Sequence, residues 1–171
     1  MNIIVLDNVF SSPDEISRLA KSHHFYSLDE HPLDANTNIT WNGKKSLYLK
    51  TILSKVLYEN IINQIISKLD FEVDIDNTVS MFHSYLENDI SSEKLFHIDT
   101  TRIGGVVYLN NVHPQNPENH GTMILHNDKS YVVPYQYNRL VLYPSNYVHR
   151  PMHGFGKTLD DSRLTLSFFI K

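Results

Sequence analysis

The chain has 171 residues, of which ten are histidine, none is cysteine and 41% are hydrophobic. The lack of cysteine excludes disulfides, a cysteine nucleophile and thiolate-ligated zinc or iron–sulfur sites, so any metal would need histidine and carboxylate ligands. Nineteen acidic residues against fifteen basic ones give a formal charge of −4 at pH 7, which argues against nucleic acid as a general partner.

The first part of the chain has the patterns of helices. A short strand is expected over Asn2–Asp7, and Ser12–Glu15 forms a capping-box pattern with proline at the first helical position, which predicts a helix to about His23. The polar stretch His31–Gly43 is interpreted as a loop or short ribbon. Apolar residues recur at three- and four-residue steps over Leu47–Leu69, which predicts an amphipathic helix, broken once.

Beyond residue 70 the pattern changes to short β-branched and aromatic runs separated by turn residues. The expected strands are Thr78–Leu86, Lys94–Asp99, Gly105–Leu109, Thr122–His126, Ser130–Val133, Arg139–Tyr143 and Arg163–Ile170. Short strands at this spacing predict a β-sandwich or barrel, with the helices packed on one outer face. We therefore expect one domain over 1–171, with 1–70 as mainly helical support and 71–171 as the β core.

The start of the chain lacks the basic region and the length of a signal peptide, and no stretch approaches the roughly 20 apolar residues of a membrane span. A cytoplasmic protein is expected, in the host cytoplasm if the protein is viral. The sequence does not indicate the oligomeric state.

The segment Phe96–Asp99 contains the chemistry-bearing pattern His-x-Asp. In a strand His97 and Asp99 point to the same face, because successive side chains alternate. His149 follows the predicted strand Arg139–Tyr143 and a Pro-Ser-Asn turn. Two histidines and one carboxylate form the facial triad that holds non-haem Fe(II) in oxygenases. The alternative is that His-x-Asp, a pattern common by chance, is an ordinary surface or core pair.

Arg163 begins the last predicted strand, on the same face as Thr165 and Ser167. A guanidinium on such a face needs an anion, and it can bind one carboxylate of a dicarboxylate whose other end chelates the metal. The alternative is a salt bridge at the strand edge with Asp160 or Asp161.

With these residues in place, the sequence resembles the 2-oxoglutarate- and Fe(II)-dependent oxygenases, particularly the prolyl-hydroxylase-like branch. The similar segments run in the family's order and cover a little over half of the chain. They are Phe82–Leu86, Phe96–Asp99, Gly105–Asn110, His120–Ile124, Asn138–Ser145 and Arg163–Leu166. The resemblance implies a double-stranded β-helix, the cupin-like jelly roll.

The resemblance also implies that His97, Asp99 and His149 hold Fe(II). The interval from His149 to the arginine is longer than is usual in this branch, and His153 would restore the shorter spacing. We favour His149 because it follows the Pro-Ser turn at the family position, and Gly154–Gly156 is a permissive place for an insertion.

The cosubstrate 2-oxoglutarate is expected to bind Arg163 and Tyr108, with Tyr85 as a further candidate. The implied reaction is hydroxylation of a C–H bond with dioxygen, releasing succinate and CO2. Peptidyl proline, a free amino acid, a small metabolite and a modified base all remain open as substrates. Of the other histidines, we expect His31 to be solvated and His83 to be a hydrogen-bonded core residue.

Two other functions remain open. One is a non-enzymatic jelly-roll module that binds a ligand or protein, because this fold hosts many functions. The other is a cupin-type metal dioxygenase that does not use 2-oxoglutarate, which predicts no role for Arg163.

Overall fold

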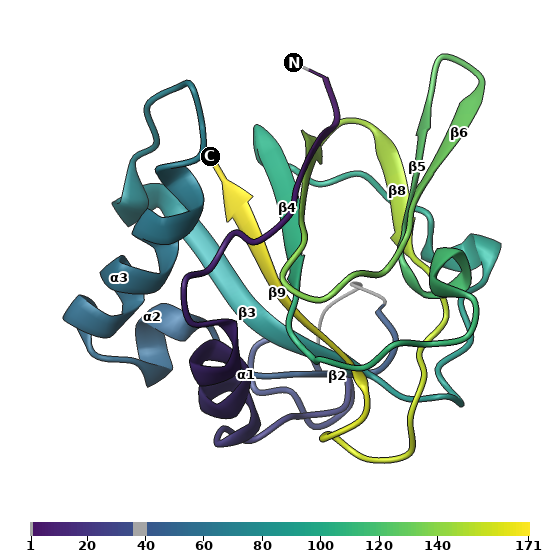
Figure 1. Cartoon of the computed structure of the whole chain (residues 1–171), viewed down its shortest axis with the longest axis horizontal. Helices are drawn as coiled ribbons and strands as arrows, with labels where there is room; N and C mark the ends of the chain where they lie inside the picture. The colour runs from purple at the N-terminus through teal and green to yellow at the C-terminus, as the bar shows by residue number, and fades with distance from the viewer. Residues whose placement is uncertain (1, 36–40) are drawn as a thin grey trace.

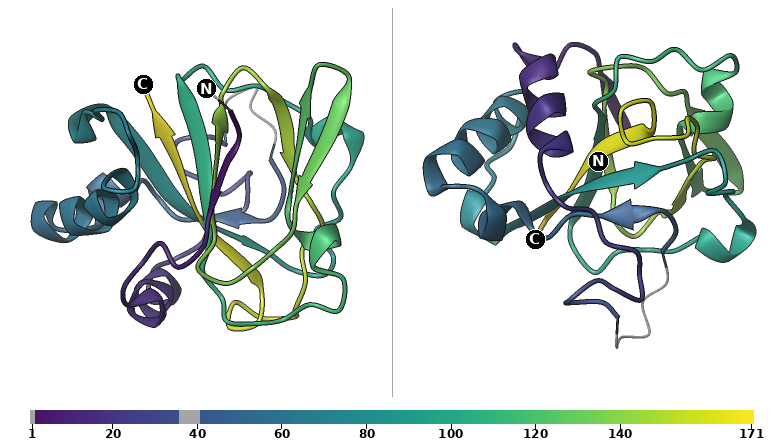
Figure 2. Two further views of the ribbon diagram at one scale, coloured as in Figure 1. Left: turned by 45° about the horizontal axis from the view of Figure 1, so that its top comes forward. Right: turned by 90° about the horizontal axis from the view of Figure 1, so that it is seen from below.

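The computed structural model describes residues 2–35 and 41–171, so residues 36–40 of the expected loop lie outside the described residues. The chain folds as a jelly roll of two antiparallel sheets (Figures 1 and 2). The larger, six-stranded sheet has the order β1 (Ile4–Leu6), β7 (Leu140–Pro144), β4 (Ile103–Tyr108), β9 (Arg163–Ile170), β3 (Thr78–Tyr85) and β2 (Lys44–Lys45). The smaller sheet has the order β6 (Lys129–Val133), β5 (Thr122–His126) and β8 (Val148–Pro151).

Three α-helices in the described part of the chain precede most of the strands: α1 (Pro13–Lys21), α2 (Leu49–Ile52) and α3 (Lys55–Ile66). Single 3₁₀ turns cover Ile75–Asn77, Glu93–Leu95 and Pro117–His120. No helix in the described ranges is long and apolar enough to cross a membrane.

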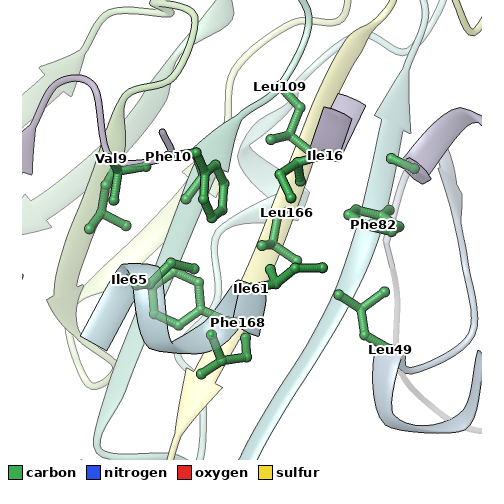
Figure 3. Close-up of a cluster of buried hydrophobic side chains, with 14 of the residues drawn as sticks. Val9, Phe10, Ile16, Leu49, Ile61, Ile65, Phe82, Leu109, Leu166 and Phe168 are labelled. Carbon is green, nitrogen blue, oxygen red and sulfur yellow. The ribbon is translucent and has the colours of Figure 1, made fainter. Parts of the chain in front are cut away.

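The helices cover the outer face of the larger sheet, as Figure 1 shows. Ile61 and Ile65 of α3 pack with Leu166 and Phe168 of β9, and Phe10 closes the same cluster (Figure 3). These side chains are almost completely buried. Burying aliphatic and aromatic side chains of this size contributes roughly 1.5–3 kcal/mol each, which fixes the helices on this face.

The inner face of the larger sheet faces the smaller sheet and carries the polar residues. The strand register sets Tyr85 opposite Arg163, and His83 and Tyr108 on either side of Thr165. Because side chains alternate along each strand, the apolar side chains of β9 point outward and its polar side chains point inward, as the sequence predicts. Apolar side chains of both sheets fill the rest of the space between them.

Several element boundaries differ from expectation. The break in the helical stripe is confirmed, because α2 ends at Ile52 and Ser54 caps α3 by accepting a hydrogen bond from the Leu57 amide. Pro13 occupies the first turn of α1, but the capping box is wrong because the Ser12 side chain makes no cap hydrogen bond.

The expected strand Lys94–Asp99 is wrong. Its first part is the 3₁₀ turn Glu93–Leu95, and only a single bridge joins His97 to His149. The strand β8 was not expected, because a four-residue strand that ends in proline has too little apolar alternation to indicate a strand.

Candidate metal centre and anion pocket

The three predicted metal ligands lie together at one edge of the smaller sheet. The backbones of His97 and His149 exchange hydrogen bonds, with N···O distances of 3.1 and 2.9 Å, which sets their rings side by side at a centroid distance of 4.4 Å. Asp99 is tied to the same edge, because its amide donates to the Ser145 carbonyl at 2.9 Å. One ligand atom from each of the three side chains lies within 4.8 Å of the others.

Both histidine rings are fixed by their Nδ1 atoms. Nδ1 of His97 lies 2.8 Å from the Leu95 carbonyl oxygen, and Nδ1 of His149 lies 2.8 Å from the Tyr147 carbonyl oxygen. A carbonyl only accepts, so Nδ1 carries the proton in both rings, and in the neutral imidazole Nε2 then keeps its lone pair. The Nε2 atoms lie 3.8 and 3.2 Å from the Asp99 carboxylate. This is the orientation of histidines that ligate a metal through Nε2.

The Asp99 carboxylate is the third member of the group. Its Oδ2 atom is buried and has no hydrogen-bond partner among the described residues. A Cβ on Gly104 would lie 3.2 Å from this oxygen, so glycine there leaves the carboxylate room. Burial, followed by the neighbouring His149, lowers the pKa of His97, which favours the neutral imidazole that a metal needs. Two imidazoles and a carboxylate oxygen that has no hydrogen-bond partner among the described residues suit a divalent cation.

Arg163 lies in the same cavity with only 2% of its surface exposed. Its Nε donates to the His120 carbonyl at 2.6 Å, and its Nη2 donates to the Gly121 carbonyl at 2.8 Å. No carboxylate forms an ion pair with it within the part of the chain that the structure describes. A buried charge without a counter-charge is costly, so the guanidinium is placed to receive an anion.

The alternative prediction for Arg163, a salt bridge with Asp160 or Asp161, is wrong. Asp160 pairs instead with Lys21 at 3.6 Å. The Asp161 carboxylate accepts hydrogen bonds from the Thr158 amide and hydroxyl, both at 2.7 Å.

Two tyrosines flank the guanidinium of Arg163. Its central carbon lies 5.1 Å from the ring centroid of Tyr85 and 5.4 Å from that of Tyr108. Burial raises the pKa of Tyr85 to about 12, so its hydroxyl is a neutral donor at physiological pH. The Tyr108 hydroxyl lies 2.8 Å from the hydroxyl of Thr122 on the smaller sheet. The two tyrosines therefore lie beside the arginine with which they are predicted to bind the cosubstrate.

One pocket of about 70 Å³ joins the candidate metal ligands to the guanidinium of Arg163. Its walls include His97 and His149 on one side and Arg163 and Thr165 on the other. A molecule in this pocket could contact both histidines of the group and the guanidinium together. The three candidate ligands alone are compatible with many kinds of metal site. The shared pocket is more specific, because it suits a molecule that binds a metal at one end and carries an anionic group at the other.

The competing ligand His153 lies elsewhere. Its Nδ1 accepts a hydrogen bond from the Ser91 amide at 3.1 Å, and it belongs to no group of metal-binding side chains among the described residues. The geometry therefore groups His149, rather than His153, with the His-x-Asp pair.

Two other histidines differ from expectation. His31 is 1% exposed, so its predicted solvation is wrong. His83 accepts or donates a hydrogen bond with Ser167 at 3.1 Å, as expected of a core histidine, but it also lines the pocket. Burial, followed by the charge of Lys45, holds the pKa of His83 well below its usual value, so the ring is neutral.

Sequence reasoning missed Lys45 and Arg150, which also line the cavities at the site. The Arg150 guanidinium lies over the Phe96 ring and donates to the Ser91 hydroxyl at 3.1 Å. Lys45 follows an exposed lysine, and such a pair normally indicates a solvated surface. No pattern in the sequence indicates that one of the two is buried.

No family model matches the chain, and no curated protein matches its sequence. Solved structures do match over 99% of its length. The fold is that of the 2-oxoglutarate oxygenases. A prolyl 4-hydroxylase from Pseudomonas putida is 13% identical with a TM-score of 0.61, and 92% of it is covered. A prolyl hydroxylase from Trichoplax adhaerens, solved with a peptide fragment of the hypoxia-inducible factor, is 15% identical with a TM-score of 0.61 and 83% coverage.

A third match is a 2-oxoglutarate, Fe(II) oxygenase family protein from Burkholderia pseudomallei, with 9% identity, a TM-score of 0.61 and 84% coverage. At these identities the likeness concerns the fold. The function must be argued from the site itself.

Proposed function

We propose that the protein is an Fe(II)- and 2-oxoglutarate-dependent dioxygenase that hydroxylates a C–H bond of its substrate. The observation that carries this proposal is the shared pocket, which is lined by both histidines of the His-Asp-His group and by a buried arginine that has no ion-pair partner among the described residues. The prolyl hydroxylases among the structural neighbours support a peptidyl substrate, with a small metabolite as the other candidate.

In this proposal His97, Asp99 and His149 hold Fe(II) through two Nε2 atoms and one carboxylate oxygen. Bound iron and 2-oxoglutarate together supply the oxidising chemistry: one oxygen atom of O2 enters the substrate as hydroxyl, the other enters succinate, and CO2 leaves. Substrate oxidation and oxidative decarboxylation each provide two electrons, which balances the four-electron reduction of O2.

The protein's own residues supply binding and orientation. Arg163 pairs with the distal carboxylate of 2-oxoglutarate, and its two hydrogen bonds to backbone carbonyls hold the guanidinium in place. The hydroxyls of Tyr85 and Tyr108 are kept protonated by burial and donate toward the same carboxylate. The apolar side chains between the sheets exclude water, which strengthens these electrostatic contacts.

The test is substrate-independent turnover of 2-oxoglutarate to succinate by the Fe(II)-loaded protein. Wild type is expected to form succinate, and Asp99→Ala is expected to abolish it, because the carboxylate is the only anionic ligand in the group. Asp89→Ala, which alters another partly buried aspartate, is the matched control and should keep the activity.

Undiminished succinate formation by Asp99→Ala would contradict the metal assignment. Two other outcomes would favour the rival functions. Iron binding without any 2-oxoglutarate binding would favour a metal dioxygenase of the cupin type, and binding of neither would favour a non-enzymatic jelly-roll module.

A further inference from the structure

A second space, here called the outer chamber, opens beside the candidate metal centre. It has a cavity volume of about 200 Å³ and shares His83, Tyr85 and His97 with the inner pocket. Its outer wall comes from the N-terminal part of the chain, with Trp41 and Lys45 among the lining residues. The chamber therefore reaches His97 and Asp99 without being lined by Arg163, and the proposed function assigns no role to its outer wall.

The chamber contains a buried charge pair. Lys45 and Asp34 are 8% and 6% exposed, and Nζ of Lys45 donates to Oδ2 of Asp34 at 2.9 Å. The Trp41 indole donates to the same oxygen at 3.0 Å, and the Lys45 ammonium lies 4.2 Å from the centre of the Trp41 ring. Strand β2 pairs Lys45 with His83, which brings the ammonium next to the residues that line the inner pocket.

The Lys45 ammonium has more hydrogen-bond donors than it has acceptors among the described residues. An ammonium carries three N–H donors, and Asp34 is the one acceptor of a hydrogen bond from Lys45 among the described residues. The Trp41 ring contacts the charge through its face but accepts no ordinary hydrogen bond. A buried donor without an acceptor is costly, so a ligand that offers an oxygen atom in the chamber would be stabilised there.

The charge of Asp34 decides which kind of oxygen fits. Because its carboxylate already balances Lys45, an incoming carboxylate would add a second negative charge next to this pair in a poorly solvated space. A neutral carbonyl oxygen accepts the same hydrogen bond without that cost. The aromatic and apolar walls, which include Tyr48, Met81 and Phe169, suit a ligand that is otherwise uncharged.

We propose that Lys45, balanced by Asp34, anchors the substrate through a neutral amide carbonyl in the outer chamber. The substrate class is then an amide-bearing molecule without a carboxylate near the reacting carbon, which disfavours free amino acids. This inference rests on the proposed function, because it assumes that chemistry occurs at the His97 face of the chamber.

The surface around the chamber supports a ligand that extends beyond it. Ile98, between two candidate metal ligands, is 57% exposed, and Ile90 is 64% exposed. The Ile90 carbonyl accepts a hydrogen bond from Asn42, a lining residue, at 3.4 Å. Exposed large apolar side chains beside a cavity are typical of an interaction site.

The experiment measures binding of N-acetyl amino-acid methylamides, one for each of the twenty side chains, to the protein loaded with Mn(II) and 2-oxoglutarate. The matching N-acetyl amino acids, which end in a carboxylate, are the comparison ligands. Binding is followed by paramagnetic relaxation of the probe's protons. Wild type is expected to bind at least one methylamide about tenfold more tightly than its carboxylate partner.

The variants separate the anchor from a structural role. Lys45→Met should weaken methylamide binding about ten- to a hundredfold, because one hydrogen bond to a charged donor is lost. The control Lys44→Met alters the exposed neighbour on the same strand and should leave binding unchanged. Asp34→Asn leaves the ammonium unbalanced and should turn the preference toward the carboxylate ligands, a change that loss of packing alone would not produce.

Lys45→Met leaves Asp34 unbalanced and could fail to fold, so the double variant Asp34→Asn, Lys45→Met is measured as well. Methylamide binding within twofold of wild type in either variant would overturn the proposal, as would wild-type preference for the carboxylates or no methylamide binding at all. If Mn(II) or 2-oxoglutarate does not bind, the proposed function fails separately. The same panel is then measured by saturation-transfer NMR on the metal-free protein, with the same outcomes.

Discussion

Replacing Arg163 with methionine tests the anion pocket directly. Arg163 is 2% exposed, and two of its N–H groups donate to backbone carbonyls. Its other N–H donors can therefore bind an anion in a space that is shielded from water. Removing one partner of such a buried, hydrogen-bonded charge pair costs about 2–5 kcal/mol. We therefore expect Arg163→Met to weaken 2-oxoglutarate binding about 30-fold to several thousandfold.

The assay is isothermal titration calorimetry of 2-oxoglutarate into Mn(II)-loaded protein, since Mn(II) occupies the site without turnover. A second ligand, 2-oxobutyrate, keeps the metal-chelating end and lacks the distal carboxylate, so its affinity should be nearly the same in wild type and variant. Arg102→Met removes an exposed guanidinium that lies over Phe71 and serves as the control. The reasoning would be refuted by an unchanged 2-oxoglutarate affinity, or by an equal loss for 2-oxobutyrate.

Three further predictions concern the site and the fold. His149→Ala should abolish stoichiometric Mn(II) binding measured by electron paramagnetic resonance, whereas His153→Ala should retain it; equal losses would contradict the ligand assignment. Asp7→Asn should lower the free energy of unfolding in urea by about 0.5 kcal/mol at pH 7, because the carboxylate pairs with Arg139 but is 39% exposed and screened. That hydrogen bond lowers the pKa of Asp7, so the contribution is present above the unfolded-state pKa of about 4 and is lost at lower pH; a pH-independent difference would contradict this. Ile65→Ala should cost about 2–5 kcal/mol in the same assay, because Ile65 is fully buried under the larger sheet, and a loss below about 1 kcal/mol would show that the helix contributes little.

The alternation of β9 could be predicted from sequence because a strand has a period of two. Leu164, Leu166 and Phe168 face the helices, while Arg163 and Thr165 face the pocket. One set is apolar and the other is polar, so the sequence alone predicts which face of β9 points inward and that this face carries a positive charge. The same reasoning related His97 to Asp99 even though their segment is not a regular strand, since an extended backbone alone keeps the alternation.

The rest of the site depends on contacts between distant segments. His149 is held by β8, whose residues lack an apolar alternation and end in proline, and the pairing with His97 forms only in the folded chain. The burial of Lys45 and His31 arises because the N-terminal segment packs beside β3, and single-residue patterns carry no information about such packing. The outer chamber could not be predicted for that reason.

The central claim is that the His97, Asp99 and His149 group and Arg163 form one composite site for Fe(II) and 2-oxoglutarate. The most direct measurement is an anaerobic titration of the wild-type protein with 2-oxoglutarate, in the presence and absence of Fe(II), followed by admission of dioxygen. The proposal predicts one equivalent of 2-oxoglutarate bound tightly only when Fe(II) is present, then succinate and CO2 in equal amounts after oxygen is admitted. Equal 2-oxoglutarate affinity with and without Fe(II), or no succinate after oxygen, would contradict it.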